Sequence, residues 1–275
     1  MKNTQKTGNK PKGAPKRNMD EDSIKCRFSV RKAHEAQLHM SEKIIFKDKL
    51  PKRIRLVAGV DIAYADDLSI GAVAVLDYDS FEIVEKQTAV CKTCFPYVPT
   101  LLSFREVRPA VLCIRKLRAR PDVFLIDGHG FAHPYHCGFA CHLGLILKQP
   151  AIGVAKSRLI GKVKTAISEV EADLIECDRE IIGAAVTTKS GCKPVYVSIG
   201  HMVSLETAVK IVKRCTKNNR IPEPILEAHR IATSEKRKIN ISSTAKRRDG
   251  ERVANPKTQC DSKKDSQRNP SEEGN

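Results

Sequence analysis

Long apolar stretches are missing from this chain of 275 residues. No run reaches the roughly 18 apolar residues that a membrane-spanning helix needs. The N-terminus is rich in Lys, Gly and Pro and has no apolar core of the kind found in secretory signals. A Gly-Lys-Ser or Gly-Lys-Thr sequence is also absent, which excludes the phosphate-binding loop of many nucleotide hydrolases. We therefore expect a cytoplasmic protein that has no membrane partner.

A paired set of cysteine motifs is missing as well. The ten cysteines are scattered, and Cys91 and Cys94 form a C-x-x-C without a second pair at zinc-finger spacing. Cys137 and Cys141 are four residues apart, which is the spacing of one helix face. In an intracellular chain we expect these thiols to be reduced and to act mainly as small hydrophobic residues. A zinc, iron–sulfur or redox role for Cys91 and Cys94 is the alternative.

Basic residues are in excess, with a formal net charge of +17. Residues 1–25 carry seven Lys/Arg and three Asp/Glu, and residues 233–275 carry eleven and seven, so each end contributes +4 and the middle keeps +9. A folded core with that excess favours a polyanionic partner, nucleic acid first; the alternative is a generally basic surface. We expect one folded domain over 26–232, with disordered tails at 1–25 and 233–275.

The pattern of apolar and turn-forming residues predicts a mixed α/β fold. Three early strands separated by tight turns indicate an antiparallel meander, and the later alternation of helix and strand suits parallel crossovers. This predicts a mixed sheet with helices on both faces, and acidic residues near its middle point to a ribonuclease H-like core. Pro109 is expected to begin its helix, and Ser204 to cap another. The expected helices are 27–48, 109–118, 135–147, 205–215 and 222–232, and the expected strands are 56–63, 70–76, 81–85, 123–126, 151–155, 181–187 and 194–199.

Two apolar strand segments each end at an aspartate, Asp61 and Asp127, and Glu106 lies between them in the sequence. Three carboxylates that converge would repel, at about 4 kcal/mol per pair for a 4 Å separation in an effective dielectric near 20. Such a cluster is tolerable mainly when a hard cation lies among the oxygens. The structural alternatives are a strand-end or turn role for Asp61 and a capping box between Ser103 and Glu106.

Six segments of the chain stand out when they are taken in order: VAGVDIAY (57–64), FPYVPTLLSFRE (95–106), PDVFLIDGHGFAHP (121–134), IGVAKSRL (152–159), PVYVSIGH (194–201) and RIPEPILEAHR (220–230). Together they closely resemble the endonuclease V family, and because they run from about residue 57 to 230 the resemblance is far more specific than any single motif. The family consists of metal-dependent nucleases with a ribonuclease H-like fold that act at inosine, the deamination product of adenine, in DNA and in some members RNA. They cut the second phosphodiester bond on the 3′ side of the altered base.

The resemblance implies a metal site and gives its ligands. The family's metal-binding aspartates fall on Asp61 and Asp127 and its acidic partner falls on Glu106. A set of carboxylate oxygens suits Mg²⁺, with Mn²⁺ as a substitute. Metal-assisted attack by hydroxide in line with the leaving 3′-oxygen would leave a 3′-hydroxyl and a 5′-phosphate.

Further catalytic groups are implied by the same resemblance. The motif lysine falls on Lys156, which follows an apolar strand and could hold the scissile phosphate. The family's histidines fall on His133 and His229. Each of the three has an ordinary alternative: a surface lysine, a histidine bonded to backbone, and a satisfied surface or core histidine. The family usually has proline two residues after its glutamate, whereas here Pro109 is three after Glu106, which shifts the expected helix start.

Recognition of the altered base is implied for a second group of residues. Tyr97 matches the family's wedge tyrosine, and Pro96 beside it stiffens the backbone of a finger that can fill the gap left by an extruded base. The alternative is a core tyrosine packed under a loop. Gly128 and Gly130 would let the backbone approach the flipped base closely.

Three other functions compete with a DNA-repair endonuclease acting on deoxyinosine. The first is the same chemistry on inosine-containing RNA, because no residue clearly accepts or excludes a 2′-hydroxyl. The second is a non-catalytic nucleic-acid binder, which would have no reason to keep three converging carboxylates. The third is a cysteine-based metal or redox protein. We expect a monomer whose partner is nucleic acid.

Overall fold

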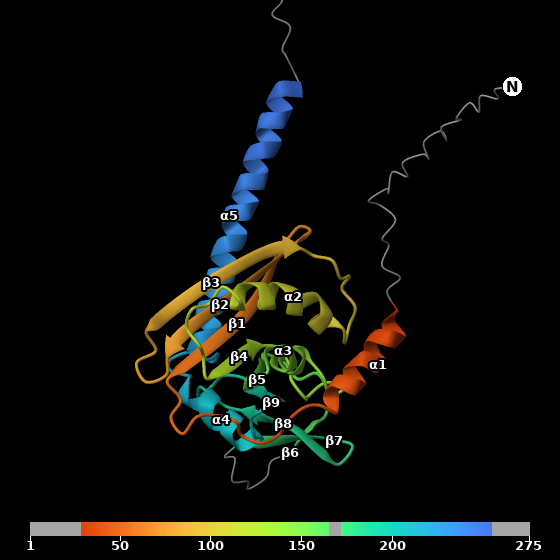
Figure 1. Cartoon of the computed structure of the whole chain (residues 1–275), viewed down its shortest axis with the longest axis vertical. Helices are drawn as coiled ribbons and strands as arrows, with labels where there is room; N and C mark the ends of the chain where they lie inside the picture. Colours follow the sequence, from red (N-terminus) through yellow and green to blue (C-terminus); the bar gives the residue numbers. More distant parts are fainter. Residues whose placement is uncertain (1–28, 165–171, 255–275) are drawn as a thin grey trace, which may run out of the picture.

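A nine-stranded mixed sheet runs through the molecule, with helices packed on both faces (Figure 1). The computed structural model describes residues 29–164 and 172–254, with residues 243–254 described by their helical backbone alone. The strands are β1 Leu56–Ala65, β2 Leu68–Asp77, β3 Ile83–Lys92, β4 Val123–Asp127, β5 Ala151–Ala155, β6 Lys162–Lys164, β7 Asp173–Cys177, β8 Glu180–Val186 and β9 Val195–His201. The helices are α1 Val30–Ser41, α2 Leu102–Ile114, α3 Phe139–Leu147, α4 Leu205–Arg214 and α5 Glu223–Ala254.

The order of the strands, β3-β2-β1-β4-β5-β9-β8-β7-β6, confirms the mixed sheet expected from the sequence. The antiparallel meander is β1–β2–β3, and the hairpin is β8–β9. α2 connects β3 to β4, which pairs in parallel with β1, and α3 connects β4 to β5, which pairs in parallel with β4. These parallel central strands are covered on both faces, which explains their nearly continuous apolar sequences.

The register of the central strands prepares the site. β1 and β4 pair from Val57 with Val123 to Val60 with Ile126. One further step in this register brings Asp61 and Asp127 to neighbouring positions on adjacent strands. The sequence predicted an aspartate at the end of each strand; Asp127 does end β4, but β1 continues to Ala65, so Asp61 lies inside its strand. The parallel pairing still makes the two aspartates neighbours.

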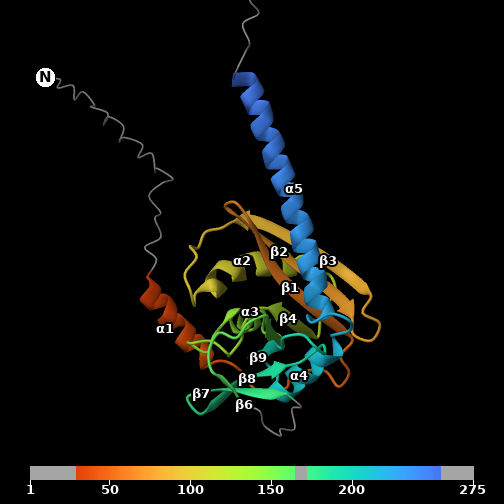
Figure 2. The ribbon, with the colours of Figure 1, turned by 180° about the vertical axis from the view of Figure 1, so that it is seen from behind.

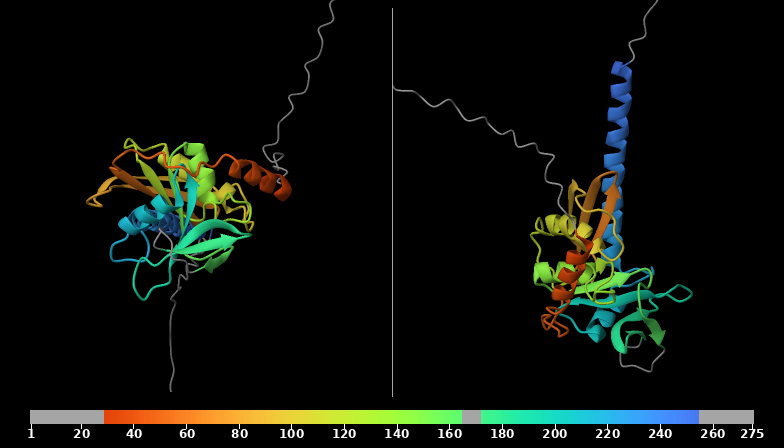
Figure 3. Two further views of the ribbon diagram at one scale, coloured as in Figure 1. Left: turned by 90° about the horizontal axis from the view of Figure 1, so that it is seen from below. Right: turned by 90° about the vertical axis from the view of Figure 1, so that its right-hand side faces the viewer.

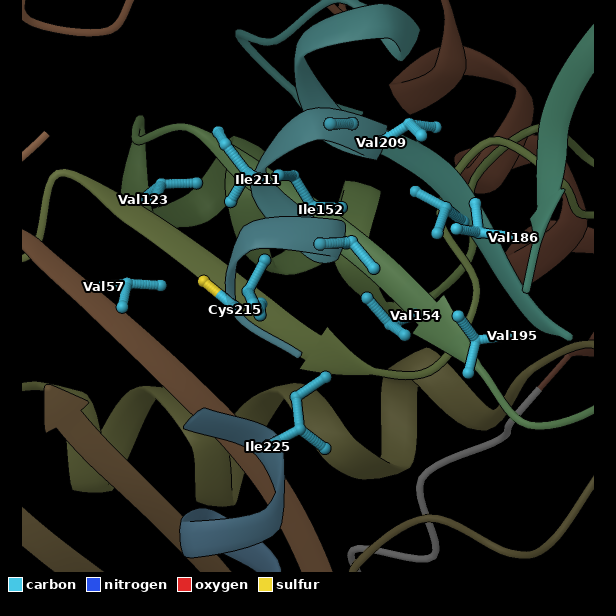
Figure 4. Close-up of a cluster of buried hydrophobic side chains, with 14 of the residues drawn as sticks. Val57, Val123, Ile152, Val154, Val186, Val195, Val209, Ile211, Cys215 and Ile225 are labelled. Carbon is cyan, nitrogen blue, oxygen red and sulfur yellow. The ribbon is translucent and has the colours of Figure 1, made fainter. Parts of the chain in front are cut away.

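Each face of the sheet has its own apolar layer. α2 and α3 cover one face, and α4 and the first part of α5 cover the other. Figure 4 shows the second layer, where Cys215 and Ile225 lie against the sheet residue Val57. Gly59 lets α5 lie directly on β1, because a Cβ there would be 1.9 Å from the Pro224 carbonyl oxygen. This close approach fixes the start of α5, and hence His229, against β1.

Helix α2 begins earlier than expected. It starts at Leu102, so Pro109 lies inside the helix and not at its first position. A proline within a helix costs about 3 kcal/mol, and packing overrides that preference here: the Pro109 carbonyl lies over Gly71 of β2, where a Cβ would be 2.2 Å away. The residue at the N-cap is Leu101, without a side-chain cap, so the capping-box alternative for Ser103 is wrong.

Other boundaries differ for local reasons. α3 begins at Phe139 and not at residue 135, because His136 has a left-handed backbone with φ of 48°. α1 is shorter than the expected 27–48 and begins after Ser29, whose hydroxyl accepts from the Lys32 amide. Ser204 caps α4 through the Thr207 amide, as predicted. β3 was placed too early, and the short strands β6 and β7 were missed because they are mostly not buried and lack an apolar run.

The last helix, α5, continues across the boundary expected at residue 232 and reaches Ala254. Figures 1 and 2 show it crossing the sheet and projecting beyond it, and Figure 3 shows the same from the side. Its first part is seated on β1 and β2, and extending an existing helix is far easier than starting one. The expected tails at 1–25 and beyond 254 lie outside the described residues.

Candidate active site

Asp61 and Asp127 lie side by side at the ends of the paired segments of β1 and β4. Asp61 is buried at 8% exposure, and the side chain of Asp127 is 15% exposed. Each of the two has one basic partner. His229 Nδ1 of α5 is 2.8 Å from Asp61 Oδ2, and Lys156 Nζ, just after β5, is 2.5 Å from Asp127 Oδ2.

Glu106 approaches the two aspartates from α2, on the opposite face of the sheet from α5. It is buried at 9% exposure, and the Tyr64 hydroxyl donates to its Oε1 at 3.5 Å. The Arg105 guanidinium lies 4.4 Å from the centre of the Tyr64 ring. Tyr64 is a site residue that the sequence analysis missed, although it closes the first family segment.

The electrostatics show that the three carboxylates act on one another. Burial, followed by the charges of Asp61 and Asp127, raises the pKa of Glu106 to about 8. Burial and then Asp127 raise the pKa of Asp61, against the lowering effect of the His229 hydrogen bond. Full ionisation of the cluster is therefore unfavourable without added positive charge.

One pocket of about 620 Å³ is lined by the three carboxylates and their two basic partners. Asp61, Glu106, Asp127, Lys156 and His229 were all expected at the site from the sequence, and the structure brings them together. Four further lining residues come from the part of α5 beyond 232, where the chain was expected to be disordered. They are Thr233, Lys236, Arg237 and Asn240, and their helical spacing from His229 is the signal that the sequence offered.

The donor set of this pocket suits a hard divalent cation. Three carboxylates supply only oxygen ligands, which Mg²⁺ and Mn²⁺ prefer, and the raised pKa values of Asp61 and Glu106 reflect a charge imbalance that a cation would relieve. Within the described part of the chain, no three His, Cys, Asp or Glu residues are already grouped closely enough to hold a metal. The aspartates are bonded instead to Lys156 and His229, so the carboxylates would have to move closer together to surround an ion.

Tyr97 stands in the loop between β3 and α2 with 71% of its surface exposed. The alternative of a core tyrosine is therefore wrong. Pro96 precedes it in the same loop, whose base is held at Thr100. His34 Nε2 of α1 is 2.9 Å from the Thr100 hydroxyl, and the Gln37 amide donates to the Thr100 carbonyl at 2.9 Å. Helix α1 thus fixes the root of the Tyr97 loop, a role that the sequence did not suggest.

His133 is not part of the carboxylate pocket. It is buried at 5% exposure, its Nδ1 accepts from the Tyr135 amide at 3.2 Å, and it bonds the backbone of Thr100. Burial, then the nearby His129, lowers the pKa of His133 to about 4. Its surroundings link it to the root of the Tyr97 loop.

The two glycines after β4 have different surroundings. Gly130 lies against β9, where a Cβ would be 2.2 Å from the Ile199 carbonyl oxygen, and its amide donates to the Ser198 hydroxyl. The fold alone therefore explains the need for glycine at Gly130. Gly128 has more room, because a Cβ there would be 3.5 Å from its nearest neighbour, an atom of the Phe139 ring.

The cysteines that the structure describes show no grouping that could hold a metal. Cys113, Cys137, Cys141 and Cys215 are buried in the core, as expected of small hydrophobic residues. Cys94 is exposed and lies 2.8 Å from Arg108 Nη1. In the described ranges, no helix has both the length and the apolar character needed to cross a bilayer.

Comparison with known proteins bears on the whole arrangement. The Endonuclease V family model matches residues 38–230. An endonuclease V from Thermofilum pendens is 46% identical over 208 residues, which are 75% of this chain and 89% of the relative. The endonuclease V structure from Streptomyces avermitilis gives a TM-score of 0.72 at 33% identity, covering 77% of this chain and 95% of that one.

A third comparison is with an endonuclease V from Ciona intestinalis, solved in complex with a 24mer DNA containing an inosine followed by a ribo-adenosine. It gives a TM-score of 0.66 at 34% identity, covering 76% of this chain and 98% of that one. The expected fold and the resemblance drawn from six sequence segments are both confirmed. The chain belongs to the endonuclease V family and is a hydrolase of the nuclease class.

Proposed function

We propose that this protein is a DNA-repair endonuclease that cuts a strand next to deoxyinosine, at the second phosphodiester bond on the 3′ side. The observation that carries the proposal is the convergence of three carboxylates, two of them buried, with a lysine and a histidine in one pocket of a chain of this family. The inosine-containing strand bound by the Ciona relative supports the choice of lesion.

The proposed cofactor is Mg²⁺, with Mn²⁺ as a substitute, held by Asp61, Asp127 and Glu106. When bound, such an ion polarises the phosphoryl group and lowers the pKa of a coordinated water. The chemistry of the oxygen donors and the mutual repulsion of the carboxylates support this assignment.

The residues around the carboxylates have separate tasks in this proposal. Lys156 carries the positive charge closest to Asp127 and can offset the charge that develops on the phosphate. His229 orients Asp61 through their hydrogen bond. In the metal-free site, Glu106 keeps its proton near neutral pH because its pKa is raised to about 8. The products would be a 3′-hydroxyl and a 5′-phosphate.

Lesion recognition is assigned to the exposed Tyr97 and the rigid backbone at Pro96. An aromatic ring held out from the surface can stack in place of an extruded base, and extrusion costs a few kcal/mol, less for a mispaired base such as inosine. Gly128 is proposed to let the backbone approach the flipped base, with Gly130 fixing the loop on β9. His133 is proposed to position the root of the Tyr97 loop.

A second candidate function is cleavage of inosine-containing RNA by the same site. The strand bound by the Ciona relative carries a ribonucleotide directly after the inosine, which favours a site that accepts a 2′-hydroxyl at this position. A monomeric state and a cytoplasmic location stay predictions from the sequence.

The test is cleavage of matched oligonucleotides by the full chain with Mg²⁺. The substrates contain one deoxyinosine in DNA, one inosine in RNA, or no lesion, and product ends are mapped on sequencing gels. Asp127→Asn should abolish cutting, whereas Asp79→Asn, an exposed aspartate paired with Arg53, should leave it unchanged. Magnesium-dependent cutting one nucleotide beyond the lesion would support the proposal. Binding of all the strands without any cutting would favour the non-catalytic binder.

A further inference from the structure

One face of α5 runs from the active site onto the part of the helix beyond the family match. The match ends at residue 230, but Thr233, Lys236, Arg237 and Asn240 line the same pocket as His229. These residues follow His229 at intervals of four, seven, eight and eleven, which places them on one side of a helix. The chain therefore extends its active-site wall with a segment outside the matched family core.

The basic residues of this pocket differ from the basic residues of α5 that line a second pocket, beside β3. Among the described residues, Lys236 and Arg237 have no acidic partner within ion-pair distance. In the second pocket, Arg230 pairs with Glu227 and Lys238 pairs with Glu235. The positive charges in the second pocket are thus each paired with a carboxylate of the same helix, whereas those of Lys236 and Arg237 are not.

The position of these two cations follows from the packing of the helix. Ala228 and Ala232 are fully buried against the sheet, so the rotation of α5 about its axis is fixed. Lys236 is half-buried and Arg237 is exposed. Both residues line the pocket that also holds Asp61 and Asp127. A positive wall next to an acidic metal site is the arrangement expected where a polyanionic strand must pass the reacting phosphate.

We propose that Lys236 and Arg237 bind phosphates of the substrate strand next to the scissile bond and position it at the carboxylates. The ligand is the phosphodiester backbone of a nucleic-acid strand, whose contacts hold register and carry no base information. This inference rests on the proposed function, since it lets the same site contact a longer stretch of the substrate strand. The two residues are positioning residues, because they act through where they hold the strand.

The experiment compares two double variants of the full chain that differ in which pocket along α5 they alter. The test variant is Lys236→Gln with Arg237→Gln, and the control is Arg230→Gln with Lys238→Gln. Each removes one lysine and one arginine from the same helix. Affinity is measured from 50 to 300 mM salt, on the order of the range in which phosphate contacts are lost, for DNA and RNA strands with and without inosine. KM and kcat are measured with the inosine strands.

The expected result is a shallower salt dependence for the test variant only. Each lost contact should reduce the slope of log affinity against log salt by about 0.7 for a single strand and about 0.9 for duplex DNA. The loss should be equal with and without inosine, KM should rise severalfold, and kcat should stay within about twofold. DNA and RNA should respond alike, because the ligand is the phosphate.

Equal slopes for the test and control variants would overturn the inference, and so would a loss confined to inosine strands. These outcomes are separate from the proposed function. If the unmodified protein cut no strand, the function would fail, while the binding slopes would still decide the role of Lys236 and Arg237. If it bound no strand at all, both would fail.

Discussion

Two groups of largely buried titratable side chains differ in whether their members repel one another. The carboxylate cluster, Asp61, Glu106 and Asp127, converges in one pocket. The second group, called the histidine cluster below, consists of two separate buried histidines, His133 at the root of the Tyr97 loop and His142 where α3 meets α2. Burial favours the neutral form of both, raising the pKa of Glu106 to about 8 and lowering the pKa of His142 to about 4.

The difference between the clusters lies in their neighbours. His142 Nδ1 is 3.3 Å from the Ser103 hydroxyl, and the His142 ring packs against Phe104. Neutral imidazole satisfies these contacts, so the histidine cluster is stable at neutral pH without any further partner. The carboxylates repel one another, and among the described residues only Lys156 and His229 lie within ion-pair distance of them. Burial alone therefore does not mark a functional site, whereas burial together with mutual repulsion does.

The largest expected effect is the loss of activity when a residue of the carboxylate cluster, but not of the histidine cluster, is substituted. Asp127→Asn should lower kcat for inosine-strand cleavage by about 10³-fold or more, the upper end of the cost of losing one preorganised electrostatic contact. The metal-free variant should unfold at an equal or higher denaturant concentration. Removing a charge relieves the repulsion felt by Asp61 and Glu106, whereas the lost pair with half-exposed Lys156 is worth at most about 1 kcal/mol.

Steady-state kinetics and urea unfolding with a chelator present would check both parts of this prediction. The histidine cluster supplies the matched control: His142→Gln should leave kcat within a fewfold of the original. A large loss of activity in His142→Gln, or unfolding of Asp127→Asn, would break the distinction between the clusters.

The second prediction concerns stability at acid pH. The folded-state pKa of His142, about 4, lies below its ordinary value of 6.5, so the unfolded chain binds the proton more readily. The contribution of His142 to stability is present above pH 6.5 and is lost as the pH falls from 6.5 toward 4. The full loss is about 3 kcal/mol, since one pKa unit corresponds to about 1.4 kcal/mol.

Urea midpoints of metal-free protein between pH 7 and 4 would measure this effect. His142→Gln should be less stable at pH 7, because it loses the contact with Phe104, but its stability should fall less steeply toward pH 4. Asp79→Asn is the surface control. If the urea midpoints of the original protein and of His142→Gln fell equally with decreasing pH, a group other than His142 would cause the loss of stability in acid.

The sequence predicted the carboxylate cluster better than its surroundings, for a physical reason. Asp127 ends β4, and Asp61 directly follows the apolar segment of β1 that pairs with β4. The local apolar pattern and the parallel pairing therefore both predict that the two aspartates are neighbours. Glu106 needed the family segments, because its local pattern also fitted a capping box that the helix start at Leu102 removes. Pro109 misled the helix assignment, since packing over Gly71 outweighs its helix penalty.

Contacts made across long separations could not be predicted from the sequence. The hydrogen bond between His34 and Thr100 joins α1 to the Tyr97 loop across 66 positions of sequence. No local sequence pattern around either residue predicts this contact. The α5 residues at the pocket were missed for a different reason. Their charged, weakly apolar stretch resembles a disordered tail, and only seating the first part of α5 on β1 shows which face of its continuation meets the site.

The third prediction concerns Tyr97, the exposed residue of the loop whose root contacts His133. Tyr97→Ala should weaken binding of duplex DNA with deoxyinosine by about 1–3 kcal/mol, the range for one aromatic–base stacking contact. Single-stranded substrate should be affected less, because it has no gap in a base stack to fill. Tyr97→Phe, which keeps the ring, should retain most of the affinity. An equal loss on duplex and single strand would argue against the wedge role.

The smallest expected effect tests whether the root of the Tyr97 loop matters. His34→Ala removes the contact with Thr100 and the stack on Tyr135, whose ring centre is 3.9 Å away. Without this contact the Tyr97 loop is less well preorganised for binding. One hydrogen bond contributes about 1 kcal/mol, so kcat/KM on duplex substrate should fall about fivefold. The loss should depend on Tyr97: in a Tyr97→Ala background, His34→Ala should have almost no further effect. Additive losses in that double variant would mean that His34 stabilises the fold generally and does not act through the Tyr97 loop.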